Sequence, residues 1–274
     1  MSTPPPPQRV AATGWDCHVH VFDDAPAAPG AHYAPVRRPL ADIEALAAAH
    51  GFGHLVLVQP SVYGTDNSVL LRALRAGAGR HRGVAVLDAL ALPSLLDEMH
   101  EAGVRGVRFN LVSPVGSQRQ AALAQLRSLA PRLRARGWHV QWYARAEDLP
   151  VIQRCQDETG LCFVLDHLAG MTPAAPAHDP AWEALSRLAA AGCWVKLSGW
   201  YRLHAAPPYD ALAPTLCHVA ALFDDRLVWG SDWPHTSFEP QALPVYESLW
   251  TPVVRVLGEA RAAALRVAGQ RLYA

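Results

Sequence analysis

Residues 14–22 read GWDCHVHVF, a short run in which polar and apolar side chains alternate as they do in a β-strand. Seven further β-rich runs follow along the chain, with helix-compatible segments between them. These runs are HLVLVQP (54–60), RGVAVLD (82–88), VRGVRFNLV (104–112), WHVQWYA (138–144), CFVLDHL (162–168), CWVKLSG (193–199) and RLVWGSDWP (226–234). Regular alternation of strand and helix is typical of parallel βαβ units, so the sequence predicts an α/β fold.

The intervening segments are rich in alanine and leucine with helical spacing, and several end in glycine directly before the next strand. These glycines are Gly103, Gly137, Gly160 and Gly192. Eight strand–helix units in 274 residues favour a single (β/α)8 TIM barrel, a fold that takes roughly 250 residues. An open, doubly wound sheet is the alternative, but the glycine-rich phosphate loop after its first strand is missing. We expect one barrel domain over residues 14–274, after a disordered proline-rich tail at residues 1–13.

The composition narrows the classes of function. The 24 basic residues balance the 24 acidic ones, which argues against a nucleic-acid partner. The chain is 51% hydrophobic and 18% charged, as globular chains are, and no apolar run approaches the roughly 18 residues that cross a membrane. The start has no apolar secretory segment, and the five cysteines contain no CxxC pair. We therefore expect a cytoplasmic protein with a small-molecule partner and no membrane partner, and a homo-oligomer is compatible with the sequence.

Polar residues gather where the strands of such a barrel end. Catalytic groups of TIM barrels sit at the carboxyl ends of the strands. Alternation places Asp16, His18 and His20 on one face of the first strand, and we expect this face to point inward. His167 is expected to end the sixth strand on the side of Phe163 and Leu165. The remaining strand-end residues are Ser61, Arg108, Tyr143 and Asp232.

Each of these residues alone has a structural explanation. A single histidine at a strand end is more often hydrogen-bonded in the core, Asp232 could cap a turn, and Arg108 could form an internal salt bridge. Burial of so many polar groups at one end is costly unless they are paired or used in chemistry. Their common placement therefore favours a functional site over separate structural roles.

The HxH pair at His18 and His20 places two imidazoles two residues apart on one strand, where both can converge on a metal ion or a substrate oxygen. Together with His167 on the sixth strand and Asp232 on the eighth, this pattern resembles the amidohydrolase superfamily. The closer resemblance is to its amidohydrolase-2 branch, in the group of 2-pyrone-4,6-dicarboxylate lactonases. It covers residues 14–233 through DCHVHVF, LVQPSVYGTDN, GVRGVRFNL, GWHVQWY, VLDHLAG, WVKLSG and LVWGSDWPH.

The resemblance implies a role for each matching residue. Asp232 would be the general base that takes a proton from water. His18, His20 and His167 would stabilise the oxyanion that develops at the reacting carbonyl. Substrate would be bound by Ser61, Tyr143, Arg108 and Arg202, the arginines facing carboxylates. Tyr33, in the long loop after the first strand, is expected to cover the site.

Two departures from the family pattern bear on the substrate. The chain has Ala169-Gly170-Met171 where members acting on the pyrone dicarboxylate carry an arginine after the glycine. It also has Ser113-Pro114-Val115 in place of further basic residues after the fourth strand. Fewer arginines indicate a substrate with fewer carboxylates, or with a different anion.

The metal content stays open. Binuclear relatives use a bridging Lys or Glu on strand four and a His at the end of strand five, where this chain has Arg108 and Tyr143. His18, His20 and Asp232 could still hold one divalent ion, for which zinc is the first candidate. The lactonase relatives can also work without a metal, in which case no cofactor is required.

The leading hypothesis is therefore a hydrolase that opens a carboxylated lactone in aromatic-compound or sugar-acid catabolism. One alternative is a metal-dependent decarboxylase of the same branch, against which the missing strand-five histidine counts. Another is a mononuclear-metal amidohydrolase that acts on a different cyclic ester or amide. A barrel that binds a ligand without catalysis is the alternative outside the enzymes, and the retained histidines and Asp232 argue against it.

Overall fold

The computed structural model describes residues 12–173, 175–176 and 178–274, and its eight strands form one sheet in chain order. The predicted disordered tail falls mostly on residues 1–11, which lie outside the described residues. Each strand is parallel to the next. The strands are β1 (Gly14–Val19), β2 (Phe52–Val58), β3 (Arg82–Ala85), β4 (Val104–Asn110), β5 (His139–Tyr143), β6 (Phe163–Leu165), β7 (Trp194–Leu197) and β8 (Leu227–Trp229). The predicted (β/α)8 TIM barrel is confirmed.

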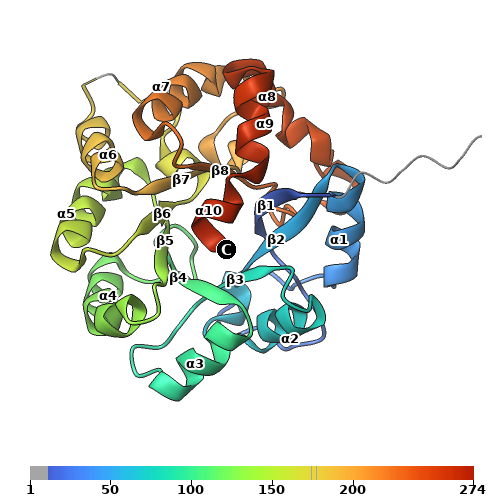
Figure 1. Ribbon diagram of the computed structural model, residues 1–274, viewed down its shortest axis with the longest axis vertical. Helices are drawn as coiled ribbons and strands as arrows, with labels where there is room; N and C mark the ends of the chain where they lie inside the picture. The colour runs from blue at the N-terminus through green and yellow to red at the C-terminus, as the bar shows by residue number, and fades with distance from the viewer. Residues whose placement is uncertain (1–11, 174, 177) are drawn as a thin grey trace, which may run out of the picture.

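Helices surround the sheet (Figure 1). Those between the strands are α1 (Leu40–Ala49), α2 (Ser68–Ala76), α3 (Pro93–Glu101), α4 (Arg119–Arg134), α5 (Leu149–Thr159), α6 (Pro180–Ala190) and α7 (Ala213–Phe223), and α8 (Thr251–Leu257) and α9 (Glu259–Val267) follow β8. Gly103, Gly137, Gly160 and Gly192 all have positive φ, as predicted for glycines that end helices. Within the described residues, no helix is long and apolar enough to cross a membrane.

The barrel closes between β1 and the segment after β8. Val19 bridges Trp233 in parallel, and the His20 amide donates to the Trp233 carbonyl at 2.8 Å. The Asp232 amide donates to the His18 carbonyl, also at 2.8 Å. The hydrogen bonds that close the barrel therefore bring the HxH pair and Asp232 together at one end, which we call the mouth.

The opposite end, which we call the floor, is covered by the C-terminal helix α10 (Gly269–Tyr273). Figure 1 shows α10 lying across the middle of the barrel. Tyr273 is fully buried, and its carbonyl accepts a hydrogen bond from Arg82 Nε, at the start of β3, at 2.9 Å. Among the described residues, α10 therefore covers the end of the barrel opposite the mouth.

The expected alternation in β1 is wrong for Asp16. The pairing of β1 with β2 shifts register between Asp16 and Val19, so three β1 steps match two β2 steps. The Asp16 carboxylate points away from the mouth. It accepts hydrogen bonds from the Tyr246 hydroxyl at 2.8 Å and from the Ser231 amide at 2.9 Å. Burial raises the pKa of Asp16 to about 6. Asp16 therefore ties the first strand to the C-terminal segment.

The expected alternation in the sixth strand is also wrong. The register aligns Leu165 with Trp142, which stacks on Phe109 away from the barrel interior. The next residue, Asp166, therefore points inward. His167 reaches the interior as well because its backbone takes a left-handed conformation, with φ of 51°.

Candidate active site

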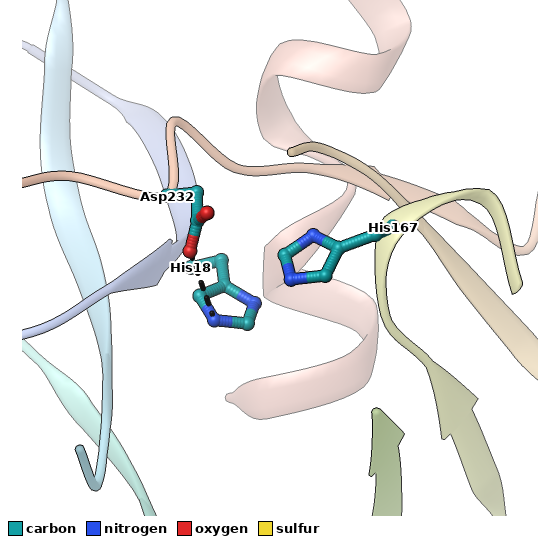
Figure 2. A group of neighbouring side chains, drawn as sticks. All are labelled: His18, His167 and Asp232. Carbon is teal, nitrogen blue, oxygen red and sulfur yellow. Dashed lines mark ion pairs between the residues drawn. The ribbon is translucent and has the colours of Figure 1, made fainter. Parts of the chain in front are cut away.

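Three side chains, one from β1 and two from the segments that follow β6 and β8, meet at the mouth (Figure 2). His18, His167 and Asp232 each offer a nitrogen or oxygen atom, and these atoms all lie within 4.8 Å of one another. His18 Nε2 lies 3.6 Å from Asp232 Oδ1, and His20 Nε2 lies 3.5 Å from the same oxygen. All four residues are buried. The structure therefore brings together the four side chains that the sequence predicted as catalytic.

The backbone at the mouth is arranged to admit these rings. A Cβ on Gly230 would lie 2.5 Å from the Cβ of His18, so this close approach of strands requires glycine. A Cβ on Gly199 would overlap the His167 ring. Asp232, like His167, has a positive φ, here 61°, which is uncommon for a non-glycine residue. Such strained backbone concentrates at functional sites.

His20 and His167 are each held by a hydrogen bond at Nδ1, from His20 to the Val58 carbonyl (2.8 Å) and between His167 and Ser198 Oγ (2.9 Å). This leaves Nε2 of both rings facing the cluster and fixes which ring nitrogen can take part in chemistry. His18 lies between two carboxylates, with Nδ1 3.3 Å from Asp166 Oδ1 and Nε2 3.6 Å from Asp232 Oδ1, and neither nitrogen has a hydrogen-bond partner among the described residues.

One of these contacts decides a tautomer. A carbonyl oxygen can only accept, so Nδ1 of His20 carries the proton. Burial lowers the pKa of His18 well below its usual value, although Asp166 opposes the shift, and burial lowers the pKa of His167 to about 4. His18 and His167 are therefore neutral at neutral pH. Ser198 can donate or accept, so His167 is free to carry its proton on either nitrogen.

The cluster has the donor set of a metal site. Among the described residues, His18 Nε2, His167 Nε2 and Asp232 Oδ1 have no hydrogen-bond partner. Imidazole nitrogens and a carboxylate oxygen are ligands that zinc accepts. The sequence named His18, His20 and Asp232 as the ligand set, whereas the atoms that converge most closely come from His18, His167 and Asp232. These residues fit one divalent ion, with His20 beside them.

The other oxygen of Asp232 is occupied by the protein. Arg202 Nε donates to Asp232 Oδ2 at 2.5 Å, and the Tyr201 hydroxyl donates to it at 2.6 Å. Burial opposes ionisation, but Arg202 and His167 hold the pKa of the Asp232 carboxyl well below its usual value. Asp232 is therefore charged at neutral pH. Sequence reasoning missed Tyr201, whose only signal was its place beside Arg202 after the seventh strand.

The predicted substrate-binding residues line one cavity above the cluster. Tyr143 lies between the two arginines, with the guanidinium carbons of Arg108 and Arg202 at 5.1 and 5.8 Å from its ring centre. Two cations facing a small polar cavity suit an anionic ligand. The lining residues include Ser61, Arg108, Tyr143, Arg202 and Tyr33, all predicted from the sequence, together with His20, His32, Pro60, Asn110, Ser113 and Thr236.

Beneath the cluster lies a buried polar group that the sequence analysis did not single out. It consists of Asp166, Gln141 and Lys196, all of which are fully or almost fully buried. The signal for Lys196 was a lysine in the middle of the apolar run CWVKLSG. Asp166 was not recognised because the expected strand alternation placed its side chain on the face toward the helices.

Comparisons with known proteins agree with this geometry. The amidohydrolase family model matches residues 15–247. The chain is 31% identical over 253 residues to 2-pyrone-4,6-dicarboxylate hydrolase of Comamonas testosteroni, covering 87% of this chain and 82% of that protein. It is 32% identical over 249 residues to 4-sulfomuconolactone hydrolase of Rhizobium radiobacter, covering 84% and 79%. A crystal structure from Pseudomonas putida, described as a candidate 2-pyrone-4,6-dicarboxylic acid hydrolase, has a TM-score of 0.82 and 34% identity, with 96% and 98% coverage.

Proposed function

The chain belongs to the amidohydrolase family and is a hydrolase, and from this premise we propose that it opens the ring of an anionic lactone with water. The observation that carries the proposal is the charged, buried Asp232, whose free Oδ1 lies beside three imidazoles beneath a cavity with two arginines. The relatives named above act on a pyrone dicarboxylate and on a sulfomuconolactone. Both names describe ring substrates with acidic groups, which supports the same substrate class here.

In the proposed reaction, Asp232 is the general base. Arg202 and Tyr201 hold Oδ2, so the carboxylate cannot rotate freely and Oδ1 stays aimed at the cluster. Oδ1 accepts a proton from the water that attacks the lactone carbonyl. Positioned proton transfer of this kind contributes about 10²- to 10⁴-fold to a rate.

The three histidines have different parts in this proposal. His167 can carry its proton on Nε2 while Ser198 donates to its Nδ1, so His167 can donate to the developing oxyanion. His20, when neutral, presents a lone pair instead, because its Nδ1 donates to the Val58 carbonyl. This ring therefore stabilises the carbonyl oxygen only through a proton or a cation that it holds. A neutral His18 has a carboxylate oxygen near each nitrogen and carries its proton on one of the two.

One divalent ion would satisfy the unpaired atoms of the cluster. His18, His167 and Asp232 would hold it, with His20 adjacent, and zinc suits this donor set. Such an ion would supply Lewis-acid chemistry, polarising the lactone carbonyl and lowering the pKa of water. The Arg202 guanidinium already balances the charge of Asp232. We therefore propose, as a second form of the mechanism, that the protein works without a metal ion.

The cavity residues orient the substrate. Arg108 and Arg202 face its anionic groups from either side of Tyr143, while Ser61 and Tyr33 complete the wall. Two arginines match one or two anionic groups. We propose a small-molecule partner only, because the cavity is narrow and the chain carries no net charge.

A panel of neutral, monocarboxylated, dicarboxylated and sulfonated lactones tests the proposal, with acid release followed by titration. We expect turnover of at least one anionic lactone and none of its neutral analogue. Absence of acid release from every lactone would overturn the proposal. Release of carbon dioxide from a carboxylated substrate would overturn it in favour of a decarboxylase. Metal analysis and assay in chelator on the same sample decide the cofactor, since unchanged turnover in chelator excludes an essential exchangeable ion.

A further inference from the structure

Beside the polar cavity at the mouth lies a second, larger cavity that has no part in the steps above. Its volume is about 300 Å³, whereas the polar cavity above the cluster measures about 50 Å³. Ligand sites usually measure about 300–1,000 Å³, so the polar cavity alone is too small for a whole ligand. Tyr33 and Thr236 line both cavities, so the second cavity directly adjoins the candidate active site.

The surface of the second cavity is mainly apolar. Arg38 and Glu239 also line it and contribute opposite charges. Val36 and Leu243 are 61% and 37% exposed, and exposed apolar side chains gathered around a hollow are typical of a binding site. The larger apolar side chains of the lining are Phe22, Tyr33, Val36, Pro234, Phe238 and Leu243. This lining suits an uncharged, apolar group.

Two walls of the second cavity continue segments that carry the cluster. Phe22 lies two residues after the HxH pair, and its amide and carbonyl form hydrogen bonds with those of Arg38 at 2.9 and 2.8 Å. On the other wall, the Phe238 ring packs edge-on against the Tyr201 ring at 4.7 Å between ring centres. The Tyr201 hydroxyl in turn donates to Asp232 at 2.6 Å. A group in this cavity is therefore held in a defined position relative to Asp232.

Another cavity, of about 260 Å³, also borders the polar one but is a poorer extension of it. It shares only Arg108 with the polar cavity, and the Arg108 guanidinium is already engaged by Asp166 at 3.0 Å. Polar atoms make up more than half of its surface, whereas apolar atoms predominate in the second cavity. This cavity therefore serves as the control for the second one.

We propose that the second cavity is a subsite for an apolar substituent, so that the chain acts on an anionic lactone that carries an alkyl or aryl group. The anionic group lies between Arg108 and Arg202, and the substituent runs past Tyr33 and Thr236 into the second cavity. Ser113, which stands in place of a basic residue in the polar cavity, supports a substrate with fewer anionic groups. The inference rests on the proposed function for the lactone, but binding of an apolar chain with an anionic end requires no turnover.

Calorimetric titration of the full chain with straight-chain carboxylates, from butanoate to octanoate, tests the subsite without turnover. Each methylene that enters the cavity should lower Kd by about two- to fourfold, because its apolar surface leaves water. The heat-capacity change of binding should become more negative with chain length, as burial of apolar surface requires. A Kd that does not depend on chain length would overturn the proposal.

Two tryptophan variants locate the bound chain. Ala34 is an exposed residue of the second cavity, and Ala34→Trp should fill that cavity and remove the gain in affinity with chain length. Val115→Trp, in the cavity that shares only Arg108, is the matched control and should keep the gain. Leu243→Trp, also in the second cavity, carries the same expectation if Ala34→Trp fails to fold. A gain that persists when the second cavity is filled, or that is lost only in Val115→Trp, places the chain elsewhere and contradicts the proposal.

Kinetics on anionic lactones with alkyl substituents of increasing length add the second readout. We expect kcat/KM to rise by about two- to fourfold per methylene, and this rise should disappear in Ala34→Trp. If carboxylate affinity rises with chain length but no lactone is turned over, the proposed function fails while the subsite stands. If an anionic lactone is turned over with the same kcat/KM whatever its substituent, the proposed function stands and the subsite is refuted.

Discussion

Buried histidines lie at both ends of the barrel, but they differ in whether their ring nitrogens have hydrogen-bond partners. At the floor, His81 is satisfied on both nitrogens: its Nδ1 accepts from the Leu55 amide at 3.1 Å, and its Nε2 lies 2.9 Å from Glu44 Oε1. At the mouth, His18 and His167 each leave Nε2 without a partner, and both atoms face Asp232. The two ends have the same residue type and similar burial, so burial alone does not mark the site.

The difference has an energetic meaning. An unsatisfied buried polar group costs about 1–3 kcal/mol, and at the mouth several such groups converge on one place. His139, at the floor, also has an unpaired Nε2, which faces Gly106, and the ring of Tyr273, whose hydroxyl is unpaired as well, lies against the His139 ring. At the mouth, by contrast, two imidazoles and a carboxylate bring atoms that can bind a metal ion within 4.8 Å of one another, and this convergence separates the candidate site from a packing feature.

The largest expected effect comes from the mouth. Asp232→Asn removes the proton acceptor while keeping the shape, so kcat on the identified lactone should fall by about 10³-fold or more. Steady-state kinetics measure this loss. His81→Gln at the floor is the matched control and should keep kcat within about twofold. Undiminished turnover in Asp232→Asn would refute the base assignment and remove the distinction between the two ends.

A smaller effect is expected at the cavity wall. Arg202→Lys keeps the charge but loses the planar pair of donors, which costs about 1.5–3 kcal/mol in a charged hydrogen bond, or roughly 10- to 150-fold. If Arg202 binds the anionic group of the substrate, this loss should appear in KM for an anionic lactone. If Arg202 only steadies Asp232, the loss should appear in kcat instead, and comparison of the two kinetic constants separates these roles.

The smallest effect on activity is expected at His139, where the change should appear in stability. Burial and the nearby Lys196 charge lower the pKa of His139 to about 3, while the unfolded residue titrates near 6.5. The unfolded state therefore binds more protons between these values, and the free energy of unfolding should decrease as pH falls from about 6.5 toward 3. Denaturant unfolding at several pH values should show a shallower decrease in His139→Gln, with kcat nearly unchanged. Equal slopes in the two proteins would contradict this account.

The strand runs and their polar ends could be predicted because β-structure has a period of two and barrel sites lie at strand ends. All five predicted substrate-binding residues line the same cavity for this reason. Alternation failed for Asp16 and around Asp166, where a register shift and a left-handed residue change the side on which side chains emerge. Neither the register shift nor the left-handed residue can be recognised from the alternation of polar and apolar residues.

The sequence by itself determined the barrel, the family and the four residues at the mouth. Strand alternation and local motifs depend only on residues that are close together in the sequence. Only the tertiary structure decided which atoms of those residues are available. Arg202 lies on Asp232, Asp166 lies beneath His18, and His167 lies against Ser198. These pairs join residues 30 or more positions apart, and the proton positions and charges at the mouth depend on them.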